Sequence, residues 1–218
     1  MNKRIIVVVV LAVFMAVSAF AQTTDFIKLV ETGTPQDVQA AISQGADVNA
    51  IDVSSETPLM HAAWHNPNPK VITTLLNAGA NLETRDAGSW TALLYCASGN
   101  QNPEVITALL KAGADVKVRD INGTTALMWA ARNNGPKVIT ALLKAGADLK
   151  DKDETLGETV LMYAAEHNPN PEVIIVLLND GADAKAKDKL GTTAFGYAQS
   201  NAKLKGTDAY KQLQEASQ

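Results

Sequence analysis

The sequence predicts an all-α repeat solenoid: stacked helix-turn-helix units from which β-hairpin fingers project. A block that begins with threonine recurs at a constant interval of 34 residues, at Thr57, Thr91, Thr125, Thr159 and Thr193. A proline follows the first four blocks, at positions 69, 103, 136 and 171. Boundary signals that recur at such a period are typical of repeat proteins, in which each unit buries its apolar side against the next.

The first 21 residues read as a signal peptide. Lys3 and Arg4 precede an apolar run over residues 5–17, and Ala19-Phe20-Ala21 is a small-residue cleavage site. The apolar run is too short for a bilayer core of about 30 Å, which disfavours a membrane anchor. We therefore expect cleavage after Ala21, a periplasmic or secreted protein without membrane insertion after cleavage, and a repeat domain over 22–218.

Composition disfavours nucleic acid as a partner and excludes disulfides as a source of stability. Losing Lys3 and Arg4 takes the formal net charge from −4 to −6, and an acidic chain without basic clusters disfavours nucleic acid. Cys96 is the single cysteine, so the chain has no internal disulfide and must be stabilised by packing. Because Cys96 occupies a position held by alanine in other units, we interpret it as a small core residue.

Each unit reads as two helices of about two turns. The first begins near Thr57, carries an apolar stripe at Leu59, Ala62 and Ala63, and ends at Asn66, because a residue before proline is pushed out of the α region.

The second helix of the unit has its own start and stop signals. It begins with Asn68 as N-cap and Pro69 in the first position, where the missing N–H is harmless, and Gly79 supplies a left-handed C-cap. Helices this short are unstable alone, so they must stack on one another.

The connector between units is a projecting finger. In the copy over residues 114–125, Asp120 to Gly123 is a tight turn with short extended pieces on both sides.

These features resemble ankyrin repeats. The family pattern appears in Thr57–Leu59, in the paired alanines 62–63 and 130–131, and in Gly146-Ala147-Asp148. The resemblance covers about 24–209, with a capping repeat at 24–56, full repeats at 57–90, 91–124, 125–158 and 159–192, and a C-terminal cap at 193–218. Two departures concern the loop between the helices: Asn-Pro replaces the family's Gly-His, and most units are one residue longer than usual.

Catalytic and metal-binding motifs are sparse. His61 and His65 are spaced i, i+4 on one helix face, which is compatible with a metal, but they lack the glutamate of H-E-x-x-H and no third ligand is evident. His167 lies three units away, roughly 30 Å by the spacing of packed helices. We expect no enzyme activity, no cofactor and no metal site.

The variable positions point to a binding surface. The resemblance implies that the outward side of the first helices and the fingers form a concave groove that binds a partner protein. Aromatic residues and arginine are the usual interface anchors. We expect partner contacts from Trp64, His65, Trp90, Tyr95, Ile121, Trp129, Arg132, Leu156, Tyr163, Glu166 and His167.

Two alternatives stay open within that set. The aromatic column formed by His61, Tyr95, Trp129, Tyr163 and Tyr197 fits packing between repeats as well as it fits binding. Arg132 and Glu166 sit in adjacent units, where they fit a mutual ion pair as well as partner contact.

The sequence therefore predicts a non-catalytic, monomeric protein–protein interaction module of the cell envelope, acting as an inhibitor or protective factor. The alternative function is a small-ligand or metal-binding envelope protein that uses the aromatic groove. An open trough favours the first, because small-ligand pockets are enclosed.

Overall fold

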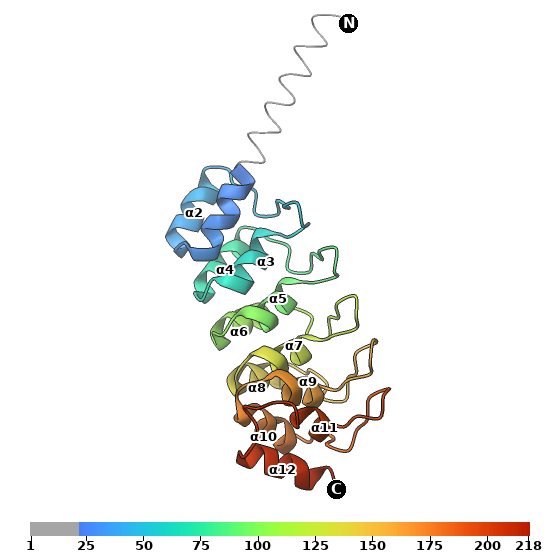
Figure 1. The fold of residues 1–218 in the computed structure, drawn as a ribbon. Coiled ribbons are helices and arrows are strands. Elements are labelled where there is room, and N and C mark those ends of the chain that lie inside the picture. The colour runs from blue at the N-terminus through green and yellow to red at the C-terminus, as the bar shows by residue number, and fades with distance from the viewer. Residues whose placement is uncertain (1–21) are drawn as a thin grey trace, which may run out of the picture.

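A computed structural model describes residues 22–218, which form an elongated stack of helix pairs (Figure 1). The predicted signal peptide at 1–21 lies outside the described residues. Within the described part of the chain, no helix is both long and apolar enough to cross a membrane.

The helices alternate between two rows. A helix over 22–32 opens the chain, and α2 spans Pro35–Ser43. The first helices of the later units are α3 Pro58–His65, α5 Ala92–Gly99, α7 Ala126–Asn133, α9 Val160–His167 and α11 Ala194–Ala198. The second helices are α4 Pro69–Asn77, α6 Pro103–Lys111, α8 Pro136–Lys144, α10 Pro171–Asn179 and α12 Asp208–Ala216.

The start and stop signals of the helices act as predicted. Thr57 caps α3 by accepting the backbone N–H of Met60, and α3 ends with Asn66 in an extended conformation. Asn68 caps α4, whose first residue is Pro69. Gly79 follows α4 with φ of 92°, a conformation that glycine adopts without a steric penalty. Pro67 therefore lies in an extended loop, and Pro69 begins the helix that follows it; each of the two helices is about two turns long.

The core runs without a break along the whole stack. First helices pack on first helices and second helices on second helices, so each unit is covered by its neighbours. Buried hydrophobic residues continue from Phe26 to Leu213. Cys96 is fully buried within this core, and burial raises the pKa of its thiol, which confirms its role as a small core residue.

A ladder of buried asparagines joins the repeats at the loop between the helices. Asn100 donates through Nδ2 to the carbonyl oxygens of Ala63, at 3.0 Å, and Asn66, at 2.9 Å. Its Oδ1 accepts the backbone N–H of Asn102 at 3.0 Å. The equivalent residues of this asparagine ladder are Asn66, Asn134, Asn168 and Asn201.

Asn134 departs from this pattern for a reason visible in the sequence. Its loop is one residue shorter, so the residue two positions on is Pro136, which has no N–H to donate. Asn134 keeps one hydrogen bond, from Nδ2 to the Ala97 carbonyl oxygen, and its buried Oδ1 has no partner among the described residues.

The fingers are tight turns rather than extended hairpins. Asp120 Oδ1 accepts the backbone N–H groups of Asn122 and Thr124, and the described fingers contain isolated bridges at Arg119–Thr125 and Lys152–Thr159. Neighbouring fingers are also joined: the N–H of Ile121 donates to the Gly88 carbonyl at 2.9 Å. The fingers therefore form a continuous row along one side of the stack (Figure 1).

Candidate protein-binding site

The aromatic column links each first helix to its own finger. Four of its side chains donate to Oδ2 of the finger aspartate: Tyr95 to Asp86 at 2.6 Å, Trp129 to Asp120 at 3.1 Å, Tyr163 to Asp153 at 3.3 Å and Tyr197 to Asp188 at 2.7 Å. In the first unit, His61 Nε2 lies 3.1 Å from Asp52 Oδ2. The column therefore has a packing role in every unit. Tyr95 is only 5% exposed, whereas Trp129 and Tyr163 are half-buried.

The electrostatics of the column keep donor and acceptor distinct. Burial raises the pKa of Tyr163 to about 12, so the phenol stays protonated at neutral pH. Burial opposes ionisation of Asp153 as well, but hydrogen bonds from Thr155 and from the backbone N–H groups of residues 156–158 outweigh it and lower its pKa. A neutral donor thus meets an ionised acceptor, although at 3.3 Å this bond is longer than a strong charge-assisted O–H···O⁻ bond.

The three tryptophans form one aromatic cluster across consecutive units. The Trp64 and Trp90 rings are stacked, with centroids 6.5 Å apart and planes 13° apart, and Trp90 lies 4.8 Å from Trp129. Tyr95 lies 5.2 Å from both Trp64 and Trp90. The sequence placed these residues on one surface but did not predict that their rings touch.

Gly99 makes room for the most exposed of these rings. A Cβ at this position would lie 2.3 Å from the Trp64 ring, so any larger residue would displace the indole. Trp64 then lies across the end of α5 with 38% of its surface exposed. The cluster therefore presents an apolar, rigid ring surface to solvent next to the fingers.

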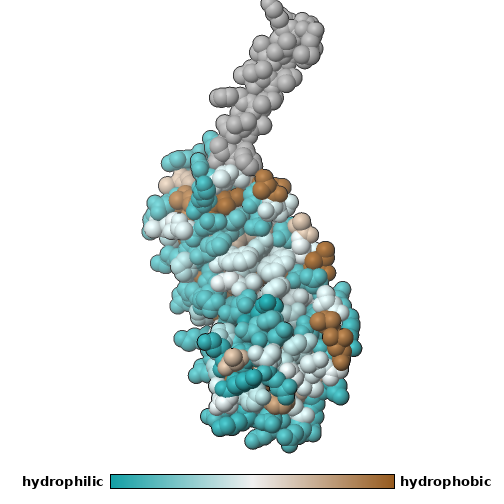
Figure 2. All heavy atoms as spheres, in the orientation of Figure 1, coloured by the Kyte–Doolittle hydropathy of each residue, from teal (hydrophilic) through white to brown (hydrophobic). Residues whose placement is uncertain are grey.

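The fingers add separate apolar tips. Ile121 is 68% exposed and Leu156 38%, and Figure 2 shows hydrophobic patches spaced along the edge from which the fingers project. Val53 and Leu190 are exposed finger residues of the same kind that the sequence reasoning did not select. Their position next to the turn of each finger is a signal that would have found them.

The charged candidates lie further along the stack. Glu166 Oε2 lies 3.1 Å from His167 Nε2, and the described residues show no ion pair between Arg132 and Glu166. Burial and the nearby positive charge of Arg132 lower the pKa of His167. Arg132 is thus left without a carboxylate partner in the described chain, although its charge is felt at His167.

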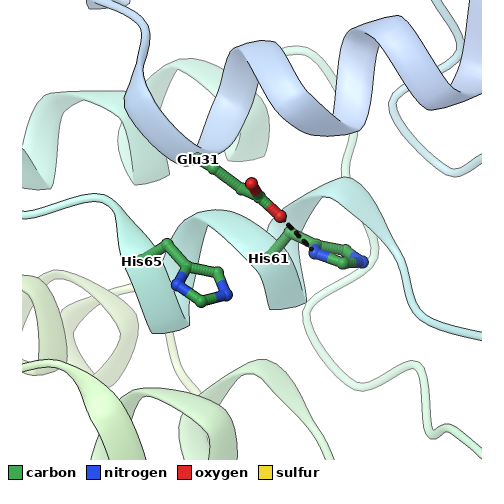
Figure 3. Close-up of side chains that lie close together, drawn as sticks. All are labelled: Glu31, His61 and His65. Atoms are coloured by element: carbon green, nitrogen blue, oxygen red, sulfur yellow. Dashed lines mark hydrogen bonds and ion pairs between the residues drawn. The ribbon is translucent and has the colours of Figure 1, made fainter.

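The two neighbouring histidines, His61 and His65, lie next to a carboxylate from another unit. Glu31, from the helix over 22–32, reaches toward α3 and places Oε1 2.9 Å from His61 Nδ1 (Figure 3). With His65 it forms a group whose ligand atoms lie within 4.8 Å of one another. A carboxylate that can serve as a third ligand therefore lies beside the two histidines; the sequence did not show it, because it comes from a different unit.

A hollow of about 650 Å³ lies away from the aromatic cluster. It is found between the second helices α4 and α6 and is lined by residues such as Lys70, Thr73, Thr107 and Lys111. The aromatic cluster and this hollow are therefore separate features of the surface.

Comparison with known proteins identifies the fold. Residues 68–153 match the family described as ankyrin repeats (3 copies), and residues 156–189 match the single ankyrin repeat. No match was found among curated proteins.

A solved structure resembles the chain over most of its length. It is that of the predatory endopeptidase Bd0816 from Bdellovibrio bacteriovorus in complex with the immunity protein Bd3460. The match to the immunity protein has 34% identity and a TM-score of 0.71, and covers 87% of this chain and 96% of that one. The matched repeats, the paired short helices and the row of fingers lead to one conclusion: the chain belongs to the ankyrin repeat family.

Proposed function

We propose that this protein is a non-catalytic inhibitor or protective factor of the cell envelope, which binds a peptidase with its fingers and the adjoining aromatic cluster. The observation that carries the proposal is the aromatic cluster of the exposed Trp64 and the half-buried Trp90 and Trp129 beside the finger row. The likeness to an immunity protein in complex with an endopeptidase supports the class of partner.

The surface has the physical properties of a binding hot spot. Tryptophan, tyrosine and arginine dominate the energetics of protein interfaces. The surface carries the exposed Trp64, the half-buried Trp129 and, three residues after Trp129 on α7, Arg132. The apolar finger tips Ile121 and Leu156 extend the same side of the stack.

Rigidity of the fingers favours tight binding. Each finger is fixed by its aspartate, by the aromatic donor of its first helix and, for Ile121, by a backbone bond to the preceding finger. A surface ordered before the partner arrives loses less conformational entropy on binding. This supports inhibition by a preformed surface, with His65, Tyr163, Glu166 and His167 as flanking contacts. Tyr95, expected from the sequence as a contact, is only 5% exposed and instead packs against Trp64 and Trp90.

The experiment is affinity capture of a peptidase from envelope extract, followed by inhibition of the captured enzyme. The test variant combines Trp64→Ser, Ile121→Ser and Arg132→Glu, all with exposed or half-buried side chains. The matched control is Lys144→Glu, which reverses an exposed charge on α8, in the row of second helices.

We expect the control to retain the peptidase and inhibit it, and the triple variant to do neither, provided that both variants melt like the unaltered protein. Equal capture by both variants would place the binding surface elsewhere. Capture without loss of peptidase activity would refute the inhibitor proposal but leave the binding surface in place.

A further inference from the structure

The junction between the N-terminal unit and the first full repeat gathers two imidazoles and a carboxylate. His61 and His65 lie one helical turn apart on α3 and project from the same side, and Glu31 descends between the units from the helix over 22–32 (Figure 3). His61 Nδ1 lies 2.9 Å from Glu31 Oε1. All three residues offer a ligand atom, and these atoms lie within 4.8 Å of one another.

We propose that Glu31, His61 and His65 form a zinc-binding site that joins the N-terminal unit to the first full repeat. Two imidazoles and one carboxylate are a ligand set that zinc accepts, with a fourth position left for water. This inference goes beyond the function proposed above and does not rest on it.

The geometry requires small movements of two side chains, Glu31 and His65. Ligand atoms about 2.0–2.1 Å from a tetrahedral zinc ion lie roughly 3.3 Å from one another. The Glu31–His61 pair, at 2.9 Å, needs to open by a few tenths of an ångström. His65 is exposed, so its ring can turn on α3 to close the remaining distance.

The far side of the His61 ring already has the partner that a metal-bound histidine needs. His61 Nε2 lies 3.1 Å from Asp52 Oδ2 and 3.3 Å from Glu56 Oε2. A carboxylate that accepts the N–H of one ring nitrogen fixes the tautomer and leaves the lone pair of the other nitrogen for the metal. Nδ1, which faces Glu31, is therefore the ligating atom.

A second grouping, of Asp52, Glu56 and His61, also lies within 4.8 Å, and it is the weaker candidate. It offers one imidazole instead of two, and imidazole is the donor that suits zinc better than carboxylate. Asp52 is also engaged in its finger, where Oδ1 accepts the backbone N–H groups of Ser54 and Glu56. We therefore assign Asp52 and Glu56 to the surroundings of the site.

A zinc ion at this place would fasten the end of the stack. Among residues 22–218, the N-terminal unit packs against a full repeat on one side only, so this single interface holds it to the stack. The ion would also fix the ring of His65, on which Trp64 is stacked with centroids 5.7 Å apart. Zinc thus links the terminal unit to the aromatic cluster.

The test is calorimetric titration of tag-free protein with zinc chloride, after treatment with a chelator. We expect one ion per chain. His65→Ala and Glu31→Gln should each weaken binding by at least about tenfold, since loss of even a surrounding hydrogen bond typically weakens metal affinity by 10- to 100-fold. Both side chains are at least partly exposed, so the variants should melt like the unaltered protein in the presence of chelator.

Two control variants locate the ion. His167→Ala removes the histidine equivalent to His65 in another repeat and should bind zinc unchanged. Glu56→Gln should weaken binding less than Glu31→Gln does, because Asp52, the nearer carboxylate, still accepts from His61 Nε2 in this variant. Zinc should raise the melting temperature of the unaltered protein and of His167→Ala, but not of His65→Ala.

Three results would overturn the assignment. Unchanged affinity in His65→Ala would exclude that residue as a ligand. Loss of binding in Glu56→Gln with retention in Glu31→Gln would move the ion to the second grouping. Absence of binding at micromolar zinc would leave His61 as an ion-pair partner of the surrounding carboxylates and nothing more.

Discussion

Replacing Asn100 by alanine tests the asparagine ladder directly. The change removes two hydrogen bonds to carbonyl oxygens of the preceding repeat and one from the backbone N–H of Asn102. A hydrogen bond contributes about 0.5–1.5 kcal/mol net, and the buried groups left unpaired add their own desolvation penalty. We expect the free energy of unfolding to fall by about 3 kcal/mol, and by no less than about 2.

Asn134→Ala is the matched control because it removes a side chain with the same position and burial. The Asn134 side chain makes one hydrogen bond and has one buried oxygen without a partner. The substitution loses the bond but also removes the unpaired oxygen, so the two effects partly cancel. We expect a loss of about 1 kcal/mol or less from hydrogen bonding.

Urea unfolding followed by circular dichroism measures the free energy of unfolding of both variants. The slope of that free energy against urea concentration should stay the same as in the unaltered protein. Equal losses in the two variants would refute the reasoning, since they would show that cavity formation, and not hydrogen bonding, determines the stability. A loss below about 2 kcal/mol in Asn100→Ala would refute it as well, since it would show that the hydrogen bonds of the ladder contribute less than their number implies.

Three further outcomes are expected from the caps and the charged groups. Thr91→Val should raise the free energy of unfolding slightly, because the buried Thr91 Oγ1 has no partner in the described chain. Thr125→Val should lower it by about 1 kcal/mol, because it removes the N-cap hydrogen bond of α7. Urea unfolding of both variants measures the difference, and equal effects would contradict the cap assignment. The lowered pKa of Asp153 contributes stability that is present above its unfolded pKa of about 3.9 and is lost as pH falls through the folded pKa. Melting temperatures measured between pH 5 and 2 should show this loss. Asp153→Asn should make the melting temperature depend less on pH, because it removes the titrating carboxylate. NMR titration should place the pKa of His167 below its ordinary value of about 6.5, and Arg132→Gln should raise it; an unchanged pKa in the variant would assign the shift to burial alone.

Much of the local structure followed from short-range rules. Thr57, Asn66, Pro69 and Gly79 set the ends of α3 and α4 through capping, missing N–H groups and backbone conformation, which depend on the residues themselves. The same rules explain why the shorter loop at Gly135 leaves Asn134 with an orphaned oxygen, although that consequence needs the tertiary contact to be seen.

The candidate site was less accessible to sequence reasoning. The aromatic column was left open between packing and binding, and its hydrogen bonds to the finger aspartates supply the packing role. Glu166 lies 3.1 Å from His167 instead of pairing with Arg132. Side chains of adjacent repeats meet according to the rotation between units, which no spacing along the chain specifies.

The sequence by itself determined the family, the period, the ends of the helices and the side of each helix that is buried, because these depend on local conformation and on apolar periodicity. The tertiary structure decided which side chains from different units come together. Glu31 and His61 are 30 residues apart in the chain, yet their side chains approach to 2.9 Å, and the rings of Trp64, Trp90 and Trp129 form one cluster. Such contacts depend on how one repeat rotates onto the next, and that rotation is set by the packing of the whole interface.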